Sequence, residues 1–185
     1  MGKHFDSLND TLTGFVLRQQ VFFVATAPAG GGGHVNVSPK GLAGSLVVID
    51  RSTVAYVDVT GSGVETIAHV RDNGRITLMF CAFEGPPLIV RLYGRGETVL
   101  PDDPGFDEML ARFPDRKAVR AVIVVHVDEV RTACGYGVPL MSYEGDRDDQ
   151  ERWADRKGEA GLVDYRVEKN SVSLDGLPGL KAEHT

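Results

Sequence analysis

The chain has 185 residues, of which 42% are hydrophobic and 25% are charged, and its formal net charge at pH 7 is −6. This length and composition are typical of a soluble globular protein with one core, so residues 1–185 are expected to form a single domain. Proteins that bind nucleic acid usually carry a basic surplus. The acidic balance therefore argues against nucleic acid as a partner.

The first residues, MGKHFDSLND, are polar and lack the apolar core of a secretory signal peptide. No apolar run approaches the ~20 residues that cross a bilayer. With no export signal, Cys81 and Cys134 indicate reduced thiols rather than a disulfide framework. We therefore expect a cytoplasmic protein that does not enter the membrane.

Taken in chain order, the elements begin with a helix in segment 1–20, where apolar residues recur at helical spacing. Segment 21–27 is rich in β-branched and aromatic residues and predicts a buried strand. After a glycine-rich turn, HVNVS at 34–38 predicts its hairpin partner. Further strands are predicted at 46–50, 53–59, 75–83, 87–99 and 118–130.

Two helices are predicted among these strands, at 62–74 and at 103–113, the second with Asp103 as cap and Pro104 at its first position. The charged tail 147–185 is predicted to be helical in two pieces, broken near Gly158 and Gly161. Many short strands and few helices predict a mainly β fold, a barrel with helical additions.

Two of the strands, 75–83 and 118–130, are apolar on both faces in their middles. Either they belong to a closed barrel that is covered outside by helices, or one face is buried against a second subunit. The sequence pattern leaves both arrangements open.

A row of polar side chains marks the stretch HVNVSPKG. His34, Asn36 and Ser38 alternate with valines, so a strand here places three hydrogen-bonding groups on one face. Pro39 is predicted to end the strand, and Lys40 follows it in a turn. This face could meet water or a ligand that carries an anion.

A second polar segment follows strand 53–59, where a Thr-Gly-Ser-Gly turn leads directly into a helix. The first N–H groups of a helix have no internal partners, and the hydroxyls of Thr60, Ser62 and Thr66 lie beside them, which suits a phosphate group. The segment lacks the ending of a P-loop. The alternative is an ordinary capping box formed by Ser62 and Glu65.

In their order and spacing, HVNVSPKG, TVAYVDV, TGSGVETIAHVRDNGRITLMF and RLYGRGE resemble the pyridoxamine 5′-phosphate oxidase-like family of FMN-binding split-barrel proteins, and CGYGVPL resembles a subgroup of it. The resemblance covers about residues 20–140. It implies a six-stranded FMN-binding split barrel that forms a homodimer, with FMN in a groove at the subunit interface.

The resemblance also implies which residues contact the cofactor. Lys40 matches a lysine that contacts the phosphate, and Arg91 matches an arginine near the cofactor. Ser62, Glu65 and Thr66 fall in the phosphate clamp, and Tyr136 could lie over a flavin edge or be a plain turn aromatic. The residues expected beside the flavin ring or ribityl chain are Asn36, Val37, Ser38, Tyr56, Val57 and Asp58.

The sequence departs from the authentic oxidases at two places. Glu65 stands in the clamp where those enzymes carry a basic pair, so the phosphate would be held by hydroxyls, backbone amides and Lys40. Segment 165–170, YRVEKN, has no match to the arginine-and-histidine signature that holds their pyridoxyl substrate. A member other than a vitamin B6 oxidase is therefore expected.

The sequence gives little support for a metal site or for catalysis by a histidine or cysteine side chain. The five histidines show no paired spacing of the metal-ligand type, so no metal site is expected. His69 is expected to be a surface or interface group, and Cys134 an inert buried thiol. We assign no catalytic residue, because in a flavoenzyme the cofactor carries the redox chemistry.

The sequence thus favours an FMN-dependent oxidoreductase that acts on an unidentified small organic substrate, with NAD(P)H or oxygen as the second reactant. A reductase of the same fold that uses the deazaflavin F420 is the nearest alternative. A non-catalytic flavin- or haem-binding module also stays open, because Asp58 and Glu65 could weaken FMN binding. The third alternative is a degenerate pocket in a purely structural dimer.

Overall fold

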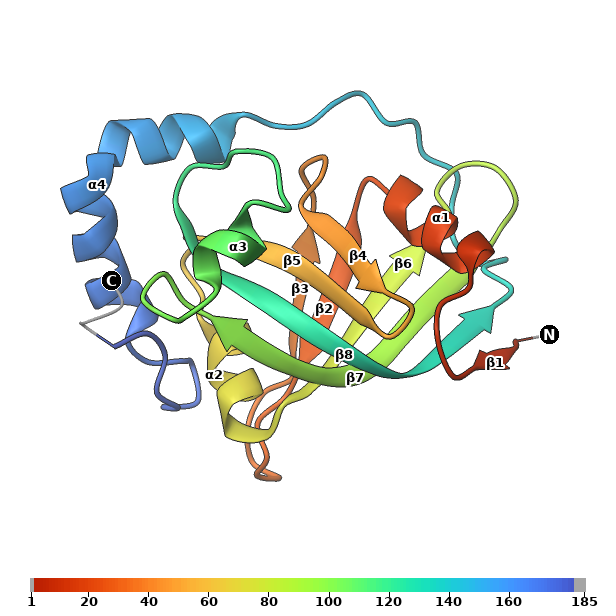
Figure 1. The fold of residues 1–185 in the computed structure, drawn as a ribbon, viewed down its shortest axis with the longest axis horizontal. Helices are drawn as coiled ribbons and strands as arrows, with labels where there is room; N and C mark the ends of the chain where they lie inside the picture. Colours follow the sequence, from red (N-terminus) through yellow and green to blue (C-terminus); the bar gives the residue numbers. More distant parts are fainter. Residues whose placement is uncertain (1, 182–185) are drawn as a thin grey trace.

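The computed structural model describes residues 2–181. Its strands form one antiparallel, eight-stranded sheet in the order β3-β2-β6-β7-β8-β5-β4, with the short β1 paired to β8. Figure 1 shows that the sheet is strongly curved, and that α1 and β1 lie near one end of the molecule and α4 lies at the other. The expected count of six strands is therefore wrong.

The elements follow the predicted order closely. The strands are β1 (His4–Phe5), β2 (Phe22–Thr26), β3 (Asn36–Lys40), β4 (Leu46–Asp50), β5 (Thr53–Val59), β6 (Arg75–Cys81), β7 (Ile89–Val99) and β8 (Val119–Ala133). The helices are α1 (Asp10–Arg18), α2 (Glu65–Asn73), α3 (Phe106–Leu110) and α4 (Asp149–Asn170). Each predicted strand and helix is present: β4 and β5 have the predicted bounds, and the other elements have shifted ends.

Strand β3 differs from the prediction in a way that matters for the site. Pro39 does not end it, because Pro39 pairs with Phe23 and the ladder continues to Lys40. Proline is tolerated here because β3 is an edge strand of the sheet. His34 lies before the strand, so the polar face consists of Asn36, Ser38 and Lys40 instead of beginning at His34.

The helices also differ from their predictions. Helix α1 begins only at Asp10, where Asn9 Oδ1 accepts a hydrogen bond from Leu12 N at 2.9 Å. Helix α3 begins after Gly105, because Asp103 accepts from Leu100 N and closes a turn before it. Helix α4 is interrupted at Gly158, as predicted, where φ is 65° and ψ is 174°. No break occurs at Gly161.

The core has two parts, one on each face of the curved sheet. The interior is built around Phe22, Tyr56 and Phe80, whose rings are in contact. On the outer face, Phe106 of the short α3 and Phe113, which follows this helix, pack against β5 and β8.

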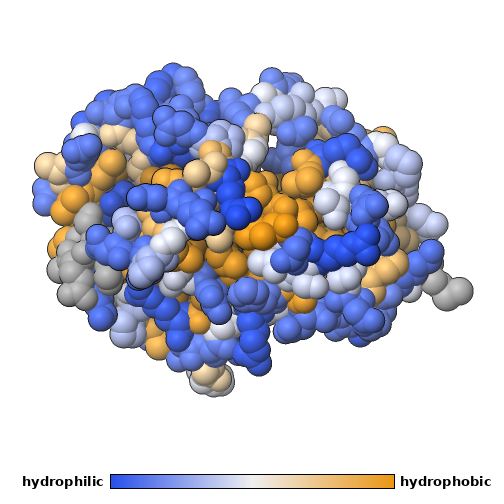
Figure 2. Space-filling model, in the orientation of Figure 1, coloured by the Kyte–Doolittle hydropathy of each residue, from blue (hydrophilic) through white to orange (hydrophobic). Residues whose placement is uncertain are grey.

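Helix α3 covers only part of that outer face. Val47 and Ile49 of β4 are partly exposed. Figure 2 shows apolar surface gathered over the middle of this side of the molecule, with hydrophilic residues around it. Within residues 2–181, no helix combines the length and the apolar character needed to cross a membrane.

Gly94 provides a test of the strand packing. It lies at a register shift between β7 and β8, and a Cβ at this position would collide with the carbonyl oxygen of His126. We expect Gly94→Ala to lower the free energy of unfolding by about 1–3 kcal/mol, the usual cost of overpacking. Denaturant unfolding measures the change.

Gly137→Ala is the matched control, because a Cβ there meets open space. Equal stability of the two variants would contradict the close approach of the backbones at Gly94.

Candidate anion-binding site

A cavity of about 430 Å³ lies between β3, the end of β5 and the start of α2. Its volume is within the range of ordinary ligand pockets. The predicted segments 36–40 and 60–66 both line it, although they are far apart in the sequence. The sequence-predicted residues in its wall are Asn36, Ser38, Lys40, Val57, Thr60, Ser62, Glu65 and Thr66.

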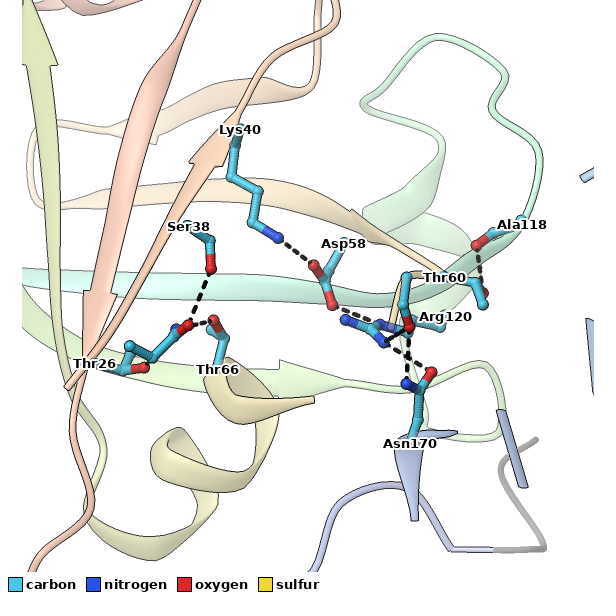
Figure 3. A network of polar contacts seen from close by, with 11 residues as sticks. Thr26, Ser38, Lys40, Asp58, Thr60, Thr66, Ala118, Arg120 and Asn170 are labelled. Atoms are coloured by element: carbon cyan, nitrogen blue, oxygen red, sulfur yellow. Dashed lines mark hydrogen bonds and ion pairs between the residues drawn. The ribbon is translucent and has the colours of Figure 1, made fainter. Parts of the chain in front are cut away.

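The carboxylate of Asp58 is fully buried beside this cavity and is held by two cations. Lys40 Nζ lies 2.7 Å from its Oδ1, and Arg120 Nε lies 2.8 Å from its Oδ2 (Figure 3). Burial alone would raise the pKa of Asp58, but the charges of Lys40 and Arg120 lower it to about 2. Asp58 is therefore ionised at neutral pH, and its charge is compensated.

Sequence reasoning missed Arg120, and the reason is a β-bulge. Asp58 pairs with Ala121 while the next residue, Val59, pairs with Val119, so Arg120 is the extra residue in β8. Strand alternation would place Arg120 on the same face as Val122. A bulge re-aims the side chain, and Arg120 reaches the carboxylate instead.

Asn170, at the end of α4, is the second residue that the sequence did not reveal. Its side chain is fully buried, its Oδ1 accepts from Arg120 Nη1 at 2.8 Å, and its Nδ2 donates to Gly61 O at 2.9 Å. Asn170 therefore holds both an arginine of the cavity wall and the turn that precedes α2. A chain separation of 50 residues from Arg120 leaves no sequence signal for this contact.

A hydrogen-bonded chain connects the polar face of β3 to the interior. Asn36 Nδ2 donates to Thr26 Oγ1 and to Thr66 Oγ1, both at 3.1 Å, and Ser38 Oγ donates to Asn36 Oδ1 at 3.2 Å. Thr66 accepts with its hydroxyl oxygen, whereas Ser38 directs its proton to Asn36 and presents lone pairs to the cavity.

The prediction that His69 is a surface or interface group is wrong. His69 is fully buried, and its Nδ1 lies 3.0 Å from Thr26 Oγ1 at the inner end of this chain. Thr26 Oγ1 also accepts from Asn36 Nδ2, so this threonine links His69 to the polar face of β3. The helix α2 is polar by composition, but the side that carries His69 faces the sheet.

The start of α2 does not form the capping box. The helix begins at Glu65, Val64 occupies the capping position, and no side chain caps it. Glu65 Oε1 instead accepts from the backbone N of Leu174 at 3.2 Å. Ser62, which has an exposed side chain, lines the cavity.

Five of the predicted residues have side chains outside the cavity wall. Tyr56 lies in the interior core, Asp58 lies beneath Lys40, and Val37 is 60% exposed on the opposite face of β3. Arg91 is half-buried on β7, and Tyr136 is 83% exposed. Within a single chain, Arg91 and Tyr136 therefore do not line this cavity.

Cys134 is exposed, so its predicted burial is wrong, and Cys81 is buried. Burial raises the pKa of the Cys81 thiol, and the charge of Arg91 opposes this. Among residues 2–181, no group of three or more histidine, cysteine or acidic side chains could hold a metal ion.

The fold and the cavity define a class: a curved antiparallel β protein with a cation-bearing pocket at the open edge of its sheet. The family model described as pyridoxamine 5′-phosphate oxidase matches residues 8–134. A curated relative from Aspergillus flavus, the pyridoxamine 5′-phosphate oxidase family protein ustO, is 42% identical over 194 aligned positions, which cover 95% of this chain and 77% of that protein. The chain belongs to the pyridoxamine 5′-phosphate oxidase family.

Solved structures support the fold. The chain resembles HupZ from Group A Streptococcus with 24% identity and a TM-score of 0.51, over 66% of this chain and 91% of that one. For the H111A variant of HupZ the identity is 23% and the TM-score 0.52, over 68% of this chain and 98% of that one.

Replacement of Asp58 tests the buried charges. Asp58→Asn leaves Lys40 and the buried Arg120 facing a neutral amide, so we expect the free energy of unfolding to fall by about 3–5 kcal/mol. Urea unfolding at neutral pH measures this loss. Asp155→Asn, which breaks the exposed pair with Lys117, is the control and is expected to cost less than about 1 kcal/mol.

The same carboxylate makes stability depend on pH. Its pKa is about 2 in the folded protein, below the ordinary value of 3.8 for an aspartate exposed to water. Its contribution, about 2 kcal/mol, is therefore present above pH 4 and is lost as the pH falls toward 2. Urea unfolding between pH 5 and pH 2 should show a steeper loss for the wild type than for Asp58→Asn. Parallel profiles would contradict this assignment.

Proposed function

We propose that the protein is a homodimeric, FMN-binding flavoprotein that acts as an oxidoreductase on a small organic substrate. The observation that carries this proposal is the meeting of segments 36–40 and 60–66 in one cavity, since both were expected to hold the cofactor. Family membership supports the same cofactor class.

The donors of the cavity fit a phosphate ester. Lys40 gives one of its three protons to Asp58, which leaves two for a ligand. Ser62 and Thr66 carry hydroxyls, and the first N–H groups of α2 lie between them in the sequence. Ammonium, hydroxyl and backbone donors together are the usual partners of a phosphate group.

The acceptors fit the remaining part of such a ligand. The lone pairs of Ser38 suit an N–H group of a heterocyclic ring, and Val57 offers an apolar wall. Bound FMN would supply the electron transfer, and the residues of this chain would bind and orient it. The sequence-derived contacts Tyr56, Asp58, Arg91 and Tyr136 stay predictions of this proposal.

The apolar outer face supports a homodimer. Val47 and Ile49 border the core packed between β5, β8 and α3, and the apolar surface continues across this face (Figure 2). Contiguous apolar surface of this kind marks interaction sites in soluble proteins. The free thiols of Cys81 and Cys134 support the cytoplasm as the location.

One observation favours the alternatives. The carboxylate of Glu65 stays in the wall of the cavity, where it opposes the binding of an anion. A reductase that uses F420, or a non-catalytic flavin- or haem-binding module, would accommodate weaker FMN binding.

The visible spectrum of the purified protein separates these functions. A yellow protein that releases FMN on heating supports the proposal. A Soret band would identify haem. A colourless protein that added FMN does not stabilise against heat would overturn the FMN assignment.

Replacement of Lys40 tests the phosphate contact. Lys40→Ala is expected to weaken FMN binding by about 1–3 kcal/mol, because a charge-assisted hydrogen bond is lost. Titration calorimetry measures the affinity, and thermal unfolding without ligand reports the effect of losing the Asp58 contact. Lys117→Ala, which removes an exposed lysine, is the control. Unchanged affinity would remove Lys40 from the site.

A further inference from the structure

The C-terminal arm, which we define as residues 149–181, contacts the turn in the cavity wall and the segment just before β3, although it lies outside the matched residues 8–134. At the β3 side, Asp175 accepts from the backbone N of His34 at 2.7 Å, and its other oxygen lies 2.6 Å from His34 Nδ1. At the side of the turn, Asn170 holds Gly61, and Leu174 N donates to Glu65. The arm therefore connects the turn before α2 with His34, which precedes β3.

Arg166 of the arm contacts the turn directly. Its Nε donates to Thr60 Oγ1 at 2.8 Å, and the same hydroxyl donates to Ala118 O at 2.9 Å. Burial and the nearby charge of Arg120 lower the pKa of Arg166. Two guanidinium groups thus lie close together at one end of the cavity.

The local charge explains why this arrangement matters. Lys40 and Arg120 both contact the carboxylate of Asp58, and Arg166 lies beside Arg120 at the turn. Ammonium and guanidinium groups are the side chains that form charge-assisted hydrogen bonds to phosphate groups.

Asn170 fixes the direction of both neighbours. Its carbonyl oxygen and its amide nitrogen are both used, one by Arg120 and one by Gly61, and the side chain is fully buried (Figure 3). Loss of the amide would release the Arg120 guanidinium and the 60–61 turn together. Both contacts are made within the chain, so Asn170 joins Arg120 to the 60–61 turn.

We propose that the C-terminal arm is a working part of the anion-binding site, in which Asn170 and Arg166 are positioning residues for Arg120 and the 60–61 turn, and these receive the phosphate ester of the ligand. The inference rests on the proposed function, in which FMN provides that phosphate.

The test compares FMN with riboflavin, which carries the same ring and ribityl chain without the phosphate. Titration calorimetry on the full chain measures both affinities for the wild type, Asn170→Ala and Arg166→Met. We expect each variant to bind FMN at least tenfold more weakly and to bind riboflavin within twofold of the wild type. Arg166→Lys, which keeps the charge, should recover most of the FMN affinity.

Arg156→Met is the matched control, because Arg156 is an exposed arginine of the same helix. It should change neither affinity. Thermal unfolding without ligand identifies any variant that fails to fold. If Asn170→Ala is such a variant, the comparison of Arg166→Met with Arg166→Lys carries the test.

Equal losses for FMN and riboflavin, or unchanged FMN binding, would overturn the role of the arm while leaving FMN binding intact. If the wild type binds no FMN, the proposed function fails, and the same variants are titrated with inorganic phosphate. Weaker phosphate binding by the arm variants would then support the arm. A wild type that binds neither FMN nor phosphate would overturn both proposals.

Discussion

The buried carboxylate of Asp58 is the contact on which the organisation of the cavity depends. β3 is one edge of the sheet and β5 is next to the other edge, so the ladder does not bring them together. Lys40 reaches from β3 to Asp58, and Arg120 reaches it from β8. The ionised carboxylate of Asp58 thus links strands that the ladder does not pair. It can stay charged without solvent only because two cations contact it.

The order of the elements could be predicted from the sequence, because β-branched runs, a left-handed glycine after α2 and the kink at Gly158 are local signals. The joint cavity of segments 36–40 and 60–66 could be predicted only through the family resemblance. The contributions of Arg120 and Asn170 could not be predicted. Arg120 depends on a bulge in β8, and Asn170 depends on a contact across 50 residues. The burial of His69 was missed because a short polar helix gives little indication of which side meets the sheet.

The family model and the C-terminal contacts concern different parts of the chain, although the relative from Aspergillus flavus aligns over 95% of it. The family model spans residues 8–134, which contain the sheet and the walls of the cavity. The residues that hold Arg120 and the 60–61 turn in place, Asn170 and Arg166, come after it. If the arm acts as proposed, relatives that share the sheet but differ in the C-terminal segment would differ in their affinity for the phosphate group.

Pro39 has a consequence for how the molecule behaves in a crowded solution. An edge strand offers a free row of backbone groups on which a strand of another molecule can add. The ladder between β3 and β2 continues on both sides of Pro39, so the amide hydrogen that proline lacks is missing from the outward row. For a strand of another molecule that adds to β3, the row of backbone hydrogen-bonding groups would be interrupted beside Lys40. Pro39, which the sequence predicts as the end of the strand, instead disfavours aggregation through strand addition at this edge.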